Sequence, residues 1–175
     1  LPLMVHVGEV PPLLDEVLAL LTPGDVVTHC FNGKRGGSIV DTPAIMGLAR
    51  RLADSGVLMD IGHGAASFSF RVARQAMAEG LRPYSISTDL HMRNVGGPVF
   101  DLATTVSKLH AAGLGFEECV AAISNRPRAF LELGAAGGLV PGTRADFTLF
   151  DVVDCDDTVR DSGGEVLCGG RRAGS

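Results

Sequence analysis

Residues 4–9 read MVHVGE: a short apolar run that contains a histidine and ends in a glycine and an acid. Three more runs of apolar and β-branched residues follow along the chain, each separated from the next by a stretch long enough for a helix. Such runs are typical of buried strands. The four predicted strands are Leu3–Val7, Asp25–His29, Val57–Ile61 and Tyr84–Thr88.

Helical periodicity fills the intervals between these strands. Apolar residues recur every three or four positions in each interval, and glycines follow the last two of the helices. The three predicted helices are Pro12–Leu21, Pro43–Asp54 and Ser69–Glu79. Strands that alternate with helices at this spacing predict βα units on a parallel sheet, and therefore an α/β fold.

The pattern changes after the fourth strand. Helices are predicted at Asp101–Ala112, with Asp101 as its N-cap, at Phe116–Ser124 and from Asn125, with Pro127 at the first helical position. A strand is predicted at Ala145–Val152. The segment from Cys155 onward is rich in Gly, Asp and Arg, and no regular structure is predicted for it.

Composition narrows the class of protein. The 175 residues are 46% hydrophobic and carry a formal net charge of −5, which disfavours nucleic acid as a partner because phosphate binding requires clustered Lys and Arg. No apolar run reaches the ~18 residues of a membrane span, and no signal peptide opens the chain. The four cysteines have no metal-site spacing, so free thiols and a cytoplasmic location are expected.

Each predicted strand ends at or beside a side chain that can bind a metal or move a proton. These side chains are His6, His29, His63 and Asp89. Parallel βα folds place their catalytic residues at the carboxyl ends of the strands, so these four side chains should lie close together at one end of the sheet. Neutral imidazoles bind zinc-like ions, and a carboxylate can both ligate and accept a proton. Asp60 is predicted to make a hydrogen bond at its strand end rather than to orient a ligand histidine.

Five segments together resemble the amidohydrolase superfamily, with the dihydroorotase-like amidohydrolase/deacetylase group as the nearest branch. The resemblance covers residues 2–151 and implies the second half of a (β/α)₈ TIM barrel, followed by helices and by strands of a composite β-sandwich domain. The segments are MVHVGE (4–9), GDVVTHCFNG (24–33), DIGHGAASFSF (60–70), SISTDLH (85–91) and NRPRAFLELGAAGGLVPGTRADFTLFD (125–151).

The resemblance also implies roles for single residues. His6 and His29 match metal ligands on barrel strands five and six, and Asp89 matches the strand-eight aspartate that is both metal ligand and general base. His63 and His91 are expected to contact substrate. The implied cofactor is a divalent metal, most often Zn²⁺, with one or two ions in the family. In the family pattern, His6 and His29 serve one ion and Asp89 serves the other.

The sequence departs from the family pattern in one large respect. It contains neither the H-x-H pair of strand one nor a counterpart of the strand-four lysine, because the resemblance begins at strand five. The expected activity is hydrolysis of amide, cyclic amide or N-acyl bonds, with deacetylation as the leading example. We expect the chain to be impaired as a catalyst by itself, and to self-associate or pair with an N-terminal half.

The sequence predicts three structural units. Residues 1–134 should form the barrel half, 135–153 strands of the β-sandwich, and 154–175 a flexible tail. The expected partner is a small-molecule amide substrate, and neither nucleic acid nor a membrane is expected to bind.

Two other functions fit the same residues. One alternative is a non-catalytic metal-binding or assembly module built on His6 and His29. Another is a metal-free half-barrel lyase or isomerase with Asp89 as its base.

Overall fold

The computed structural model describes residues 1–134, 141–142, 147–154, 156–168 and 171–174, the last four by their backbone only. Its first half is built on a parallel sheet in the order β1-β2-β3, formed by β1 (Met4–His6), β2 (Val26–Thr28) and β3 (Leu58–Met59). The register sets His6 beside Thr28 and Val27 beside Met59. The prediction of an α/β fold with parallel strands is therefore confirmed.

The connecting helices lie where the periodicity indicated, with shorter ends. They are α1 (Leu14–Leu18), α2 (Pro43–Ser55) and α3 (Phe70–Ala78). Thr42 caps α2 by accepting from the Ile45 amide at 3.2 Å, and Gly56 ends it with φ +105°. α1 begins only after the two prolines, where the Glu16 carboxylate accepts from the Leu13 amide at 2.9 Å.

The core lies between the sheet and these helices. Val27, Met59 and Ile61 are at most 1% exposed and pack with Met46 of α2 and Phe70 of α3 in one apolar cluster. Burial of each large aliphatic side chain is worth about 1.5–3 kcal/mol. Because side chains alternate along a strand, Met4, Val26 and Leu58 point to the opposite face, where they line a groove.

The fourth predicted strand, Tyr84–Thr88, forms only part of a strand. One parallel bridge joins Ser85 to Asp60, and further along Ser87 O accepts from the His63 amide and Thr88 O from the Gly64 amide, each at 3.0 Å. The segment therefore follows β3 in parallel. Side-chain hydrogen bonds to Asp60, described below, add to these backbone bonds.

Three helices follow this segment: α4 (Leu102–Ala111), α5 (Phe116–Ile123) and α6 (Asn125–Phe130). Asp101 caps α4 through a 2.6 Å bond from the Thr104 amide, as the sequence indicated. Pro127 is the third residue of α6 and not its first. It is tolerated there because the first-turn amides of a helix have no carbonyl partner within it.

The C-terminal segment is where the structure differs most from the sequence prediction. The predicted strand Ala145–Val152 is absent from its described part 147–150, and β4 (Asp151–Asp154) begins later and pairs antiparallel with β7 (Arg171–Gly174). β5 (Thr158–Arg160) and β6 (Val166–Cys168) form a hairpin where no regular structure was predicted. The strand prediction also covered residues that lie outside the described ones.

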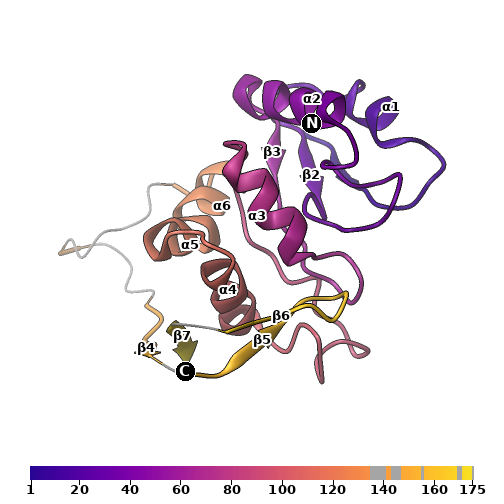
Figure 1. Ribbon diagram of the computed structural model, residues 1–175. Helices are drawn as coiled ribbons and strands as arrows, with labels where there is room; N and C mark the ends of the chain where they lie inside the picture. The colour runs from indigo at the N-terminus through magenta and orange to yellow at the C-terminus, as the bar shows by residue number, and fades with distance from the viewer. Residues whose placement is uncertain (135–140, 143–146, 155, 169–170, 175) are drawn as a thin grey trace.

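The hairpin forms because Asp161 closes its turn. The Asp161 carboxylate is 3% exposed and accepts from the Gly163 and Glu165 amides at 2.9 and 2.8 Å. Figure 1 shows β5 and β6 crossing the foot of α4, with the sheet and α2 at the other end of the molecule. Over the described residues, no helix combines the length and the apolar character needed to cross a bilayer.

Asp60 links three neighbouring parallel segments. Its two carboxylate oxygens accept from Thr28 Oγ1 at 2.7 Å and from Ser85 Oγ and Ser87 Oγ at 2.6 Å each, and the residue is 1% exposed. It makes these hydroxyl contacts at the end of β3, so the prediction of a strand-end hydrogen bond for Asp60 is confirmed.

Replacement Asp60→Ala should lower the free energy of unfolding by about 3 kcal/mol or more, because three hydroxyls lose a charged acceptor in a buried place. Denaturant titration of the protein measures this. Asp54→Ala, which removes an exposed carboxylate at the end of α2, is the control and should change stability by less than about 0.5 kcal/mol. Equal losses in the two variants would contradict a role for Asp60 in joining the strands.

Candidate functional site

His6 and His29 lie at the carboxyl ends of β1 and β2, and their rings face each other. His6 Nδ1 is 3.0 Å from His29 Nε2, and the ring centroids are 5.0 Å apart in an edge-on arrangement. His6 is exposed on β1, whereas His29 is 8% exposed and has φ +64°. The parallel register, which places His6 beside Thr28, brings the two rings together.

A backbone carbonyl fixes the tautomer of His29. His29 Nδ1 is 2.5 Å from Gly62 O, and because a carbonyl only accepts, Nδ1 carries the proton and Nε2 keeps its lone pair. Gly62 is required here, since a Cβ on it would lie 2.2 Å from Thr28 Oγ1 and 2.8 Å from His29 Nδ1. Metal-binding histidines typically donate their second ring nitrogen in this way.

The histidine pair fits a divalent ion of the zinc type. Two nitrogen ligands of a tetrahedral zinc ion, each about 2.0–2.1 Å from the metal, lie ~3.3 Å from each other. The observed 3.0 Å between His6 Nδ1 and His29 Nε2 is close to that spacing. Among the residues that the structure describes, no three His, Cys, Asp or Glu side chains form a group able to hold a metal, so Asp89 does not join the pair in such a group.

Asp89 follows the Tyr84–Thr88 segment and is exposed. Its φ of +49° is in the left-handed region, which Asp tolerates better than most residues. Asn94, which is fully buried, holds this turn by donating from Nδ2 to Asp89 O at 2.9 Å and accepting from the His91 amide at 2.8 Å. A Cβ on Gly64 would lie 2.9 Å from Asp89 Oδ2, so the carboxylate packs against that glycine.

His63 is fully buried and both of its ring nitrogens have partners. Nδ1 donates to Gly64 O at 2.9 Å, and Nε2 accepts from Lys108 Nζ at 3.0 Å. Lys108, 1% exposed on α4, also donates to Pro98 O. Burial, with the Lys108 charge as a second cause, lowers the pKa of His63 to about 4. Burial lowers the pKa of Lys108 to about 8, against the opposing charges of Asp161 and Asp101.

Comparison with known proteins identifies the relatives of this chain. The chain is 54% identical, over 165 residues, to a deacetylase of Agrobacterium fabrum, and the match covers 94% of this chain and 40% of that protein. Among solved structures it resembles a dihydroorotase, with TM-score 0.95 and 53% identity, and an adenine deaminase, with TM-score 0.90 and 42% identity. Each match covers 99% of this chain and less than half of the other, 47% and 48%. No protein-family model matches the sequence.

The chain is similar to part of each of these proteins, as expected from its resemblance to the amidohydrolase superfamily. It spans less than half the length of the relatives that it matches. The resemblance that the sequence motifs indicated is thereby confirmed. The assignment of single residues to amidohydrolase roles remains a prediction.

The structure brings together some of the predicted amidohydrolase residues and separates others. His6 and His29 face each other, and Asp89 packs against the loop that contains His63. The two nitrogens of His63 are already bonded, so a contact with substrate would require one of them to be released. His91 is exposed, and its Nδ1 accepts from the Arg93 amide at 3.1 Å.

Two residues that the sequence prediction did not single out contact this region: Lys108 and Ser162. Lys108 carried a detectable signal, because it lies three residues after Thr105 and four before Ala112 on the buried stripe of α4. A lysine in such a stripe needs a buried partner. Ser162 carried none, since the contact depends on a hairpin 98 residues away in sequence from Gly64.

The low pKa of His63 should make the protein less stable in acid. The unfolded chain takes up this proton near pH 6.5, whereas the folded protein does so only near pH 4, so stability falls as the pH drops through that window. Protonation of His63 across this pH window should lower the free energy of unfolding by about 3 kcal/mol. Denaturant titrations between pH 4 and 7 on wild type and His63→Gln should show a shallower dependence in the variant. His110→Gln is the control for loss of a histidine, and an unchanged pH dependence in His63→Gln would contradict the assignment.

Proposed function

We propose that this chain is part of a metal-dependent hydrolase that acts on carbon–nitrogen bonds of amide, cyclic amide or N-acyl substrates, with deacetylation as the leading reaction. The observation that carries the proposal is the 3.0 Å approach of His6 Nδ1 to His29 Nε2, with the His29 tautomer set by Gly62 O. The likeness to a deacetylase, a dihydroorotase and an adenine deaminase supports it, since enzymes with these three names hydrolyse carbon–nitrogen bonds.

We also propose that residues 1–134 form the second half of a (β/α)₈ barrel. In support, β1, β2 and β3 are parallel, the next segment continues in the same direction, and polar side chains lie at the carboxyl ends. A groove of about 480 Å³ lies on the face of the sheet opposite α2 and α3, between Met4, Val26 and Leu58 of the strands and residues of α4, α5 and α6. This face would be the barrel interior, and the exposed Met4 would meet an N-terminal half. Residues 135–153 would belong to a β-sandwich unit.

His6 and His29 would hold a divalent ion, for which Zn²⁺ is the first candidate. A bound ion of this kind polarises a carbonyl and lowers the pKa of a water molecule. His29 would present its Nε2 lone pair with the ring held in place by Gly62 O. His6 would approach from the neighbouring strand and would present Nδ1 once that nitrogen gives up the proton that it donates to His29 Nε2.

Asp89 would be the general base. Its exposed carboxylate can accept a proton from the attacking water and donate it to the leaving nitrogen, and general acid–base catalysis of this sort contributes about 10²–10⁴-fold. Asn94 would hold the backbone of this residue, and Gly64 would support its carboxylate. The substrate proposed is a small-molecule amide.

Metal binding should depend on His29. Mass-spectrometric metal counts after equilibration with Zn²⁺ should show one ion on the wild-type protein. The Zn²⁺ affinity of His29→Ala should be lower by more than about 100-fold. Removing a group that only hydrogen-bonds to a metal ligand already costs about 10–100-fold, and removing the ligand itself should cost more. His110→Ala, on α4, should bind as the wild type does. Equal metal content in wild type and His29→Ala would argue against the site.

Hydrolysis should depend on Asp89. When the chain is paired with an N-terminal half and assayed with N-acetylated and cyclic amide substrates, Asp89→Asn should lower kcat by about 10²–10⁴-fold and leave KM nearly unchanged, because the proton is moved only in the transition state. The exposed carboxylate variant Asp54→Asn should keep full activity. Activity that persists after treatment with a chelator would instead support a metal-free lyase or isomerase with the same base.

A further inference from the structure

The loop after β3 directly supports the Asp89 carboxylate. The Gly64 amide donates to Thr88 O at 3.0 Å, so the loop is bonded to the segment that leads into Asp89. A Cβ on Gly64 would lie 2.9 Å from Asp89 Oδ2, a separation that real Cβ atoms do not adopt without movement of a neighbour. The lack of a side chain at Gly64 therefore leaves room for the carboxylate next to the loop, and the bond to Thr88 O ties the loop to the segment that carries it.

The turn between β5 and β6 reaches this loop from the other side. Ser162 Oγ donates to Gly64 O at 3.0 Å, and the Ser162 amide donates to Phe68 O at 3.1 Å. The adjacent Asp161 accepts from the Phe70 amide at 2.9 Å, at the start of α3. Two successive residues of the turn are thus bonded to residues 64–70.

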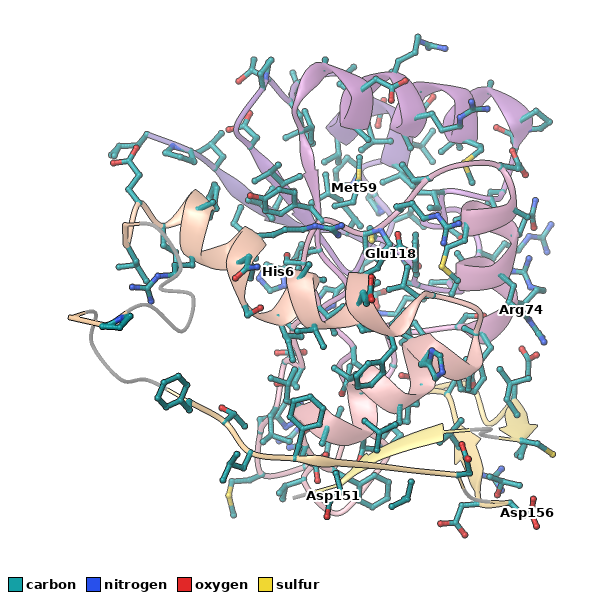
Figure 2. The ribbon with its side chains drawn as sticks, turned by 90° about the vertical axis from the view of Figure 1, so that its left-hand side faces the viewer. His6, Met59, Arg74, Glu118, Asp151 and Asp156 are labelled. Carbon is teal, nitrogen blue, oxygen red and sulfur yellow. The ribbon has the colours of Figure 1, made fainter. Side chains whose placement is uncertain are left out.

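An ion pair on the outside holds the same hairpin. Arg74 of α3 pairs with Glu165, just before β6. Figure 2 shows Arg74 on the side of the molecule where α3 approaches the hairpin, well away from Asp151 at the base. The hairpin therefore has anchors that do not involve Gly64, and the Ser162 hydroxyl adds a contact that docking alone does not require.

Gly64 O is a shared acceptor. It accepts a hydrogen bond from His63 Nδ1 at 2.9 Å and another from Ser162 Oγ at 3.0 Å. His63 is in turn held by Lys108, which also donates to Pro98 O. Two chains of hydrogen bonds, one from α4 and one from the hairpin, therefore end on the carbonyl of the glycine that supports Asp89.

We propose that Ser162 is a positioning residue for Asp89: it fixes Gly64 from the C-terminal hairpin, and the Gly64 amide, through Thr88 O, holds the backbone that leads into Asp89. The catalytic part of this inference rests on the proposed function, in which Asp89 is the general base. The coupling between Ser162 and Asp89 does not, because it is a property of the fold.

The coupling is tested by nuclear magnetic resonance on the metal-free protein, residues 1–175. Ser162→Thr keeps the hydroxyl, and Ser162→Val has the same shape without it, so the two variants differ only in the proposed hydrogen bond. The Gly64 and Asp89 amide resonances should shift in Ser162→Val and in Ser162→Ala and return toward wild type in Ser162→Thr. Ser55→Ala is the matched control, because it removes a hydroxyl bond to a carbonyl, Leu52 O, at the end of α2.

Kinetics test the consequence. With the metal site filled, Ser162→Val should lower kcat by about tenfold with KM unchanged, because a misplaced base slows the chemical step, and Ser162→Thr should restore it. An Asp89 resonance that does not move when Gly64 moves, or the same kcat in the Thr and Val variants, overturns the inference. If the wild-type protein hydrolyses no amide substrate, the proposed function fails, and the resonance shifts of Asp89 still decide the coupling.

Discussion

The Asp60 carboxylate is the interaction on which the arrangement of the strand ends depends. It accepts hydroxyl hydrogen bonds from Thr28 on β2 and from Ser85 and Ser87 in the segment that follows β3. That segment makes a single β-bridge and further backbone hydrogen bonds to the β3 side, and the side-chain bonds to buried Asp60 reinforce them. Because the bonds lie at the carboxyl ends, they set those ends at one level. His6, His29 and the loop that supports Asp89 can then lie on one edge of the sheet.

Close backbone approach is the second constraint, and it requires glycine at two neighbouring positions. Gly62 lies against Thr28 and His29, and Gly64 lies against Asp89. Both have positive φ, +48° and +58°, which glycine adopts without steric cost. The single residue between them, His63, points into the core and bonds to Lys108. The GHG sequence (residues 62–64) thus lies between the histidine pair and the Asp89 carboxylate, and its central residue, His63, anchors it in the core.

The sequence predicted the framework well because local rules decide it. Alternating strands and helices, the Asp101 cap and the Gly56 stop depend on residues near one another in the chain, and the structure has them where expected. The fourth strand and the C-terminal hairpin were predicted less well. A charged residue such as Asp161 indicates exposure by composition, yet it is buried because three backbone amides, one of them from Phe70 on α3, surround its carboxylate.

For the candidate site, the sequence by itself determined which residue types stand at the ends of the strands and which family they resemble. Strand ends can be recognised from apolar runs, and parallel βα topology then sends them to one edge. Only the tertiary structure decided that His6 and His29 face each other, that Gly62 O sets the tautomer of His29, and that Lys108 and Ser162 hold the loop under Asp89. These contacts join residues between 23 and 98 positions apart, and such pairs are set by packing of the whole chain and not by any local pattern.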